Sequence, residues 1–225
     1  MNGRFAVYHT PAATSELALF AAGWLGSEAG TAAGIPEDLH RDVVRIPRIY
    51  GFHATLKAPF ALAPGTTGED LATATAALAA DFGAFRAPPL DLATVDQFIA
   101  LVLREPCPAM NDLAAACVTE LDHLRAPLAS RERERRVSQG LSARQEALLD
   151  RWGYPFVLDE FRFHMTLTRR LDDGLRERIA GSLGHRMGHL IGREWCVDSI
   201  SLVHQASREE PFTMWARFPL RQPEG

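Results

Sequence analysis

Apolar and polar positions alternate in some stretches of this chain and recur every three to four residues in others, which predicts a mixture of strands and helices. Strands are expected at residues 4–9, 50–60, 90–95, 97–103, 160–168, 194–204 and 211–218. Helices are expected at residues 15–27, 67–82, 109–124, 142–152 and 172–183. We interpret residues 30–47, which contain glycine, proline and charge, as a loop. Helices and antiparallel strands mixed in this order predict an α+β fold.

The order of these elements indicates that one unit is used twice. A strand, a helix, a strand, a helix and two strands are followed by two helices, a strand, a helix and two strands. We therefore expect a single bilobal domain over residues 1–225, with approximate halves at 1–105 and 106–225. The halves share little sequence, so the duplication rests on the pattern of elements.

Composition narrows the class of protein. Of the 225 residues, 47% are hydrophobic and 23% are charged, as in an ordinary soluble globular protein. The net charge of −4 argues against a non-specific nucleic-acid binder. Three cysteines without CxxC spacing favour neither a disulfide framework nor a structural zinc site. Because no apolar run of about 18 residues and no leader-like N-terminus is present, we expect a cytoplasmic protein without a membrane segment.

A four-residue pattern of the form His-x-Thr-Leu occurs twice. The copies are His53–Leu56 and His164–Leu167, and each follows a phenylalanine within an expected strand. Successive side chains of a strand point to opposite faces, so the histidine and threonine of each copy share one face. Each copy thus presents an imidazole beside a hydroxyl, and two copies that face one another would hold a phosphate between two histidines.

This pair suits the opening of a cyclic phosphodiester without a metal. Histidine titrates near neutral pH, so His53 and His164 can act as the catalytic acid–base pair. The hydroxyls of Thr55 and Thr166 can donate hydrogen bonds to the non-bridging phosphate oxygens. A metal site is the alternative, since paired histidines are common ligands, but the motifs contain no acidic residue and no third ligand is well placed. We therefore expect neither a metal nor another cofactor.

Three further residues are candidate substrate ligands. Lys57 is expected on the face of His53, and Arg162 on the face of His164, where either side chain can pair with phosphate. Tyr154, like Tyr8 and Tyr50 near the expected strands, can stack on a sugar or base, with core packing as the alternative for each tyrosine.

A charged run at residues 131–136 contains four arginines and two glutamates. One interpretation is a phosphate-binding lid. The other is a solvated segment whose charges compensate one another.

Through its two motifs the chain resembles the 2H phosphoesterase superfamily, which is named for two His-x-Thr/Ser-x motifs and includes RNA ligase-like cyclic phosphodiesterases. The resemblance implies two pseudo-symmetric lobes of antiparallel sheet, with helices outside and the motifs facing across a central cleft. The stretch 141–155, leading into 160–164, is similar to a narrower subfamily encoded with phosphonate-utilisation genes. That likeness implies a small cyclic sugar phosphate as substrate, and the arginine-rich run departs from the general pattern.

The leading hypothesis is a metal-independent phosphoesterase that hydrolyses a small cyclic phosphate or phosphodiester in phosphonate or nucleotide metabolism. Its partner would be a small phosphorylated substrate, with RNA less favoured and no membrane involved. One alternative is a phosphodiesterase or ligase that processes RNA ends bearing a 2′,3′-cyclic phosphate. Another is a binding module that holds a phosphorylated ligand without turnover.

Overall fold

Seven antiparallel strands form one continuous sheet in the order β4-β5-β6-β2-β1-β8-β9. The computed structural model describes residues 3–26 and 34–222. The strands of this sheet are β1 (Arg4–His9), β2 (Ala54–Phe60), β4 (Leu90–Val95), β5 (Phe98–Leu103), β6 (His164–Thr166), β8 (Ser199–Gln205) and β9 (Thr213–Pro219). Two shorter strands, β3 (Phe85–Ala87) and β7 (Trp195–Val197), pair with each other outside it.

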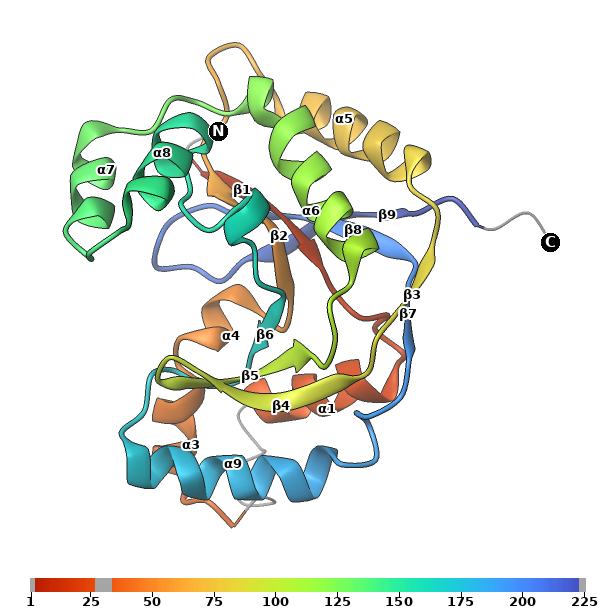
Figure 1. Ribbon diagram of the computed structural model, residues 1–225, viewed down its shortest axis with the longest axis vertical. Coiled ribbons are helices and arrows are strands. Elements are labelled where there is room, and N and C mark those ends of the chain that lie inside the picture. Colours follow the sequence, from red (N-terminus) through yellow and green to blue (C-terminus); the bar gives the residue numbers. More distant parts are fainter. Residues whose placement is uncertain (1–2, 27–33, 223–225) are drawn as a thin grey trace.

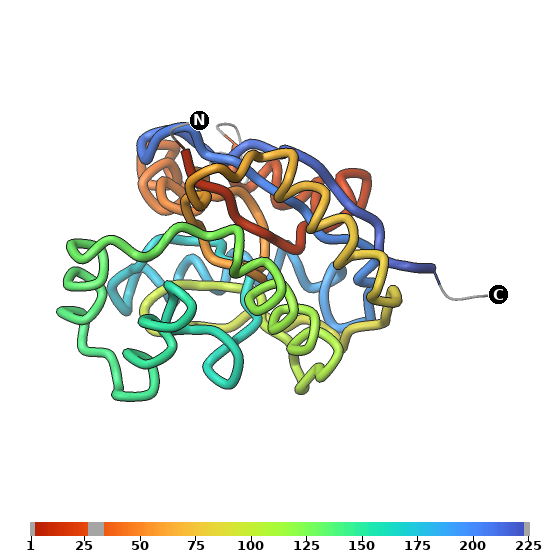
Figure 2. The backbone as a smooth tube through the Cα atoms, turned by 90° about the horizontal axis from the view of Figure 1, so that it is seen from above, coloured from red at the N-terminus to blue at the C-terminus, as the bar shows by residue number. Residues whose placement is uncertain are grey.

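Helices pack against the sheet and extend beyond it (Figure 1). In chain order they are α1 (Glu16–Leu25), α3 (Glu37–Val44), α4 (Pro47–Tyr50), α5 (Gly68–Asp81), α6 (Pro108–Glu120), α7 (Ser130–Val137), α8 (Ala143–Trp152) and α9 (Asp173–Met187). Helix α5 contacts β8 and β9, α6 contacts β2, and α9 contacts β4 and β5. Helices α7 and α8 contact each other and lie together at one side of the molecule (Figure 2). The expected α+β class is confirmed.

The two parts of the sheet, one on the β4 side and one on the β9 side, join where β6 lies beside β2. These strands pair only through Ala54 and Met165, and both side chains are fully buried. Strands from the first half of the sequence, β4 and β5, lie beside β6, whereas β8 and β9 lie beside β1. Each end of the sheet therefore combines strands from residues 1–105 and from residues 106–225.

Most of the expected elements occur, and the differences have local causes. The expected loop at 30–47 is wrong where it is described, because α3 and α4 form there. In α3, His40, Val43 and Val44 are buried at a spacing of three and four residues, which is a helical face that the surrounding charges obscured. The start of the strand expected at 50–60 is wrong as well, because Tyr50 ends α4 and the strand begins at Ala54.

The second motif strand is shorter than expected, with three residues instead of nine. The segment 194–204 divides into β7 and β8, which belong to different sheets. The charged run forms helix α7, where no helix was expected. Within the described residues, no helix has both the length and the apolar character that a bilayer crossing requires.

Candidate active site

The two motifs lie beside each other on one face of the sheet. Ala54 pairs with Met165, and continuing this antiparallel register by one residue sets His53 opposite Thr166 and Thr55 opposite His164. The two histidines are then diagonal neighbours, a relationship that typically separates backbone positions by roughly 7–8 Å. The electrostatic effect of His164 on the pKa of His53 agrees with this proximity.

Both imidazoles are held in the same way. Nδ1 of His53 lies 2.9 Å from the carbonyl oxygen of Gly51, and Nδ1 of His164 lies 2.8 Å from the carbonyl oxygen of Arg162. In each case the acceptor is two residues before the histidine. Since a carbonyl only accepts, each Nδ1 carries a hydrogen and donates it, which leaves Nε2 as the nitrogen available for proton transfer.

His53 sits in a partly buried and aromatic environment. Its ring stacks on Tyr8 with centroids 3.7 Å apart, and its Nε2 lies 3.0 Å from the Thr55 hydroxyl. Burial lowers the pKa of His53 to about 4, and the neighbouring His164 lowers it further, while the bond to Gly51 raises it. The side chain is therefore neutral at pH 7.

His164 lies at the other side of the motif pair, with the Phe98 ring 5.9 Å away. Across β5, Val102 pairs with His164 and Ala100 with Thr166, so small aliphatic side chains flank this motif. Arg162 is exposed in the segment just before β6, and it contributes its carbonyl to the histidine.

Aromatic rings form a wall beside His53. Phe212 stacks on Tyr50 with centroids 5.5 Å apart and lies 5.8 Å from Tyr8. The Phe212 amide donates to the carbonyl of Ile49, which fixes the β8–β9 loop on α4. Tyr8 is 1% exposed, and its hydroxyl has no hydrogen-bond partner among the residues that the structure describes. A buried polar group of this kind calls for a ligand or a water, because leaving it unpaired is costly.

Tyr154 belongs to the same region. The turn that follows α8 positions it, with Gly153 at φ +75°, a conformation that favours glycine. The Arg136 guanidinium lies 5.0 Å from the centre of the Tyr154 ring. Tyr50 and Tyr154 both act electrostatically on the Tyr8 hydroxyl, whose pKa is raised chiefly by burial. The structure thus brings Tyr154 near the tyrosines that surround His53.

The structure does not place Lys57 with the motif. Its Nζ donates to the carbonyl of Val118 in α6 at 2.9 Å and lies 3.9 Å from Asp122, and the residue is 3% exposed. The cause is a bulge: Thr55 pairs with Tyr8, but Lys57 pairs with Val7, the next residue before it. The extra residue turns Lys57 onto the face covered by α6 and corrects the expectation that it shares the face of Thr55.

The positive charge of the arginine-rich run at residues 131–136 is compensated in part by carboxylates. Arg133 forms a two-pronged ion pair with Asp150 of α8, and Arg135 pairs with Glu132 at 2.7 Å. Arg136 also pairs with Glu132, at 3.1 Å, but it additionally lines a cavity. The interpretation as a solvated segment fits Arg133, whereas Arg136 lies at a site that a ligand can enter.

Sequence reasoning considered Tyr8 for stacking on a sugar or base, without connecting it to His53, and did not mention the side chain of Arg4. Both lie on one face of β1, four residues apart. The signal was available, because alternation in a strand puts residues 4, 6 and 8 on one face. Among the described residues, no group of three or more histidine, cysteine, aspartate or glutamate side chains is arranged to hold a metal ion.

The class of this protein is an α+β fold in which one sheet brings two His-x-Thr motifs together. Comparison with known proteins gives its family. A family model described as "Protein of unknown function (DUF1045)" matches residues 55–213. The chain belongs to this family.

Two curated relatives are both named ribose 1,5-bisphosphate phosphokinase PhnN. The relative from Janthinobacterium sp. (strain Marseille) is 35% identical over 228 residues, covering 96% of this chain and 50% of the relative. The relative from Laribacter hongkongensis (strain HLHK9) is 37% identical over 178 residues, covering 76% of this chain and 41% of the relative. The chain thus spans half or less of the length of these relatives.

Solved structures with a similar arrangement share little sequence with the chain. E. coli LigT in its apo form has a TM-score of 0.49 and 13% identity, with 98% of each chain covered. E. coli LigT complexed with 3'-AMP has a TM-score of 0.48 and 14% identity, with 97% of this chain and 98% of the other covered. The protein TT0787 of Thermus thermophilus has a TM-score of 0.47 and 18% identity, with 98% of this chain and all of the other covered.

Proposed function

We propose that this protein is a metal-independent phosphoesterase that opens a small cyclic phosphate with His53 and His164 as its acid–base pair. The observation that carries the proposal is the antiparallel pairing of the two motifs, which sets each histidine opposite the threonine of the other motif. Two imidazoles and two hydroxyls on one face of a sheet match the requirements of an in-line displacement at phosphorus. The resemblance of both motifs to the 2H phosphoesterase superfamily supports the same function.

The lowered pKa of His53 suggests which of the two histidines acts as the base and which as the acid. His53 is neutral at pH 7, so its Nε2 accepts the proton of the attacking water as the water oxygen bonds to phosphorus. The bond from phosphorus to the departing sugar oxygen breaks, and His164 takes the remaining role of general acid, giving a proton from Nε2 to that oxygen. Exchange with solvent then returns both imidazoles to their starting states.

The threonines stabilise the charge that develops on phosphate. In the free protein the Thr55 hydroxyl lies 3.0 Å from Nε2 of His53, so it is already positioned beside the reacting atoms. Rotation about one bond directs its hydrogen to a non-bridging oxygen. Thr166 lies two residues from His164 in β6 and so shares its strand face, and donors fixed in advance are effective because they need little reorganisation.

The names of the relatives point to the chemical class of substrate. Both are named for ribose 1,5-bisphosphate, which is a ribose that carries two phosphates. Hydrolysis of a cyclic phosphate formed on a phosphorylated ribose releases a ribose with two separate phosphates. We therefore propose a cyclic ribose phosphate as substrate, in a sequence of reactions related to phosphonate metabolism.

The kinase activity in those names is not part of this proposal. A P-loop kinase needs the pattern GxxxxGK[ST], whose lysine contacts the nucleotide phosphates. Lys57 is the only lysine in the sequence, it follows Leu56, and its ammonium is bound under α6. The motif of that phosphate site is therefore absent from this chain.

The test is a substrate panel followed by ³¹P NMR. Ribose cyclic phosphates and an oligonucleotide ending in a 2′,3′-cyclic phosphate are incubated with the purified chain, with and without EDTA. We expect ring opening of the small substrates, unaffected by EDTA. Loss of activity in EDTA that a divalent ion restores would contradict the metal-free mechanism.

Two other outcomes would favour the alternatives. Faster turnover of the oligonucleotide, falling steeply as salt rises, would indicate an RNA-processing enzyme, because RNA binding releases counterions. Binding of every small ligand without product would indicate a non-catalytic binding module.

A further inference from the structure

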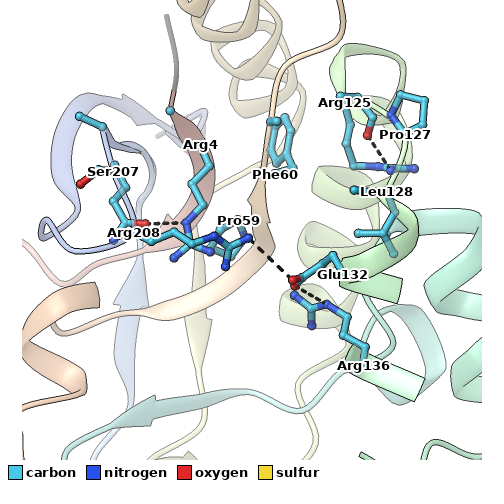
Figure 3. A pocket seen from close by; sticks show the side chains of 17 residues that line it. Arg4, Pro59, Phe60, Arg125, Pro127, Leu128, Glu132, Arg136, Ser207 and Arg208 are labelled. Atoms are coloured by element: carbon cyan, nitrogen blue, oxygen red, sulfur yellow. Dashed lines mark hydrogen bonds and ion pairs between the residues drawn. The ribbon is translucent and has the colours of Figure 1, made fainter. Parts of the chain in front are cut away.

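A cavity of about 310 Å³ opens at the end of β1 and β2 that lies away from His53. Its lining comes from the start of β1, the end of β2, the segment leading into α7, α7 itself and the β8–β9 loop. Four arginines line it, Arg4, Arg125, Arg136 and Arg208, and Glu132 is the one acidic residue among the lining residues (Figure 3). Its size is that of a small-ligand site.

The positive charge of this cavity is only partly compensated. Arg136 and Arg208 approach the Glu132 carboxylate at 3.1 and 3.7 Å, and Arg135 approaches it at 2.7 Å, so three guanidinium groups share one carboxylate. These arginines lower the pKa of Glu132, led by the Arg135 hydrogen bond, so the carboxylate is charged at pH 7. One negative charge leaves the group with an excess of positive charge.

Arg4 adds a cation without a carboxylate partner among the described residues. Its Nε donates to the side-chain oxygen of Gln205 at 2.5 Å, and its guanidinium lies 5.3 Å from the centre of the Phe212 ring. Gln205 and Phe212 are both neutral. Arg125, by contrast, is paired with Asp122 at 2.8 Å and is not available to a ligand in the same way.

Arg4 also connects the cavity to the histidines. It lies on the face of β1 that carries Tyr8, four residues along the strand. This spacing separates the two backbone positions by roughly 13 Å, and the long Arg4 side chain spans part of that distance. Arg4 is close enough to the Tyr8 hydroxyl to lower its pKa, and Tyr8 in turn stacks on His53. Arg136 reaches the same region through its contact with Tyr154.

From this arrangement we propose that the cavity binds a second phosphate of the substrate, held by Arg4, Arg136 and Arg208, while the cyclic phosphate lies between the histidines. This inference rests on the proposed function and names the class of substrate more closely: a small cyclic phosphate that carries a further phosphate ester. Guanidinium groups bind phosphate through paired, charge-assisted hydrogen bonds. The Tyr8 hydroxyl, which is buried and has no hydrogen-bond partner among the described residues, lies on the β1 face that carries Arg4 and beside His53, and it is the group that we expect to meet a hydroxyl of the sugar.

Arg208 is the group that must move. Its side chain is 64% exposed, and its 3.7 Å contact with Glu132 is the longest of the three. An incoming phosphate competes with Glu132 for Arg208 and Arg136, and the Glu132 carboxylate keeps Arg135 as its partner.

The test compares two substrates that differ by one group, a ribose cyclic phosphate and the same compound with a 5-phosphate. We expect wild-type kcat/KM to favour the doubly phosphorylated compound by roughly 10- to 100-fold, mostly through KM, which is the range for a charge-assisted hydrogen bond. Arg4→Gln and Arg136→Gln should remove most of this preference. Arg133→Gln is the matched control, because Arg133 lies on the same helix but pairs with Asp150.

Equal kcat/KM for both substrates in the wild type, or a preference that survives both substitutions, would overturn the inference and leave the proposed function standing. A binding measurement separates the two failures. If no compound is turned over, calorimetric titration with ribose 5-phosphate still tests the cavity. Binding that is lost in Arg136→Gln and kept in Arg133→Gln supports it, and absence of binding to the wild type refutes it.

Discussion

The phenol ring of Tyr8 stacks on the imidazole of His53, with ring centroids 3.7 Å apart and an interplanar angle of 23°. The stacking comes from neighbouring strands, because Tyr8 pairs with Thr55 two residues along from His53. It shields one face of the imidazole from water and contributes to the burial that lowers the pKa of His53. Tyr8 thus helps to set the protonation state of the proposed base.

The Tyr8 hydroxyl can be removed without removing the ring. Tyr8→Phe keeps the stacking on His53 and deletes a buried hydroxyl that has no partner within residues 3–26 and 34–222. We expect the free energy of unfolding to stay the same or rise by up to about 1 kcal/mol, because no hydrogen bond is lost. Turnover should fall, mainly through a higher KM. A clear loss of stability with unchanged KM would show that the hydroxyl serves the fold.

The two threonines should matter to similar degrees. Thr55→Val and Thr166→Val keep the shape of each side chain and remove its donor. We expect each to lower kcat/KM by an amount that corresponds to roughly 1–3 kcal/mol, the usual range for a hydrogen bond to a charged group. Thr119→Val on the exposed side of α6 is a control, since that hydroxyl donates only to the Ala115 carbonyl. Wild-type kinetics in both motif variants would remove the threonines from the mechanism.

Stability should fall as pH falls, in part because of His9. This residue is 1% exposed, and burial lowers its pKa to about 4, below the ordinary value of 6.5. Between those two pH values the unfolded chain binds the proton more readily than the folded chain. The stability present above pH 6.5 is therefore lost on acidification, by up to about 3 kcal/mol for one such histidine.

Urea unfolding at pH 7 and pH 4.5 measures this dependence. His9→Gln should weaken it, while His123→Gln, which changes an exposed histidine, should leave it as in the wild type. An unchanged pH dependence in His9→Gln would mean that His9 does not remain neutral in the folded protein.

Lys57 offers a chemical test of its placement because it is the only lysine. Burial lowers its pKa to about 8, which would make an accessible amine reactive. Since its ammonium is bound to the Val118 carbonyl and covered by α6, an amine-directed reagent should modify Lys57 only after unfolding, as read by mass spectrometry. Rapid modification of the native protein, slowed by added phosphate, would instead place Lys57 in the substrate site.

Much of the fold was accessible from sequence because its signals are local. Strand β1 was expected at residues 4–9 and occurs there, and α5 begins after Thr67, which caps it together with Asp70. Helix α3 was not predicted, because its buried face consists of only three residues within a charged segment. The length of β6 could not be read either, since it depends on how far β2 and β5 extend beside it.

In the candidate site, too, the features that follow from local sequence could be predicted, and those that depend on contacts between distant segments could not. The pairing of His53 with Thr55 and of His164 with Thr166 follows from strand alternation, which is a local rule. Lys57 obeys that rule in the sequence but not in the structure, because the bulge arises from the pairing of β2 with β1. The contribution of Arg4 and Arg136 to one cavity depends on helix α7 and strand β1 coming together, a contact between residues more than a hundred positions apart.

The most direct test of the central claim is the turnover of a ribose cyclic phosphate by His53→Ala and His164→Ala, measured beside the wild type by ³¹P NMR. Thermal unfolding of each variant, followed by circular dichroism, checks that the fold is retained. We expect each substitution to lower kcat by roughly 100-fold or more, as the loss of a general acid or base does. A folded variant of either histidine that turns over substrate at the wild-type rate would contradict the two-histidine mechanism.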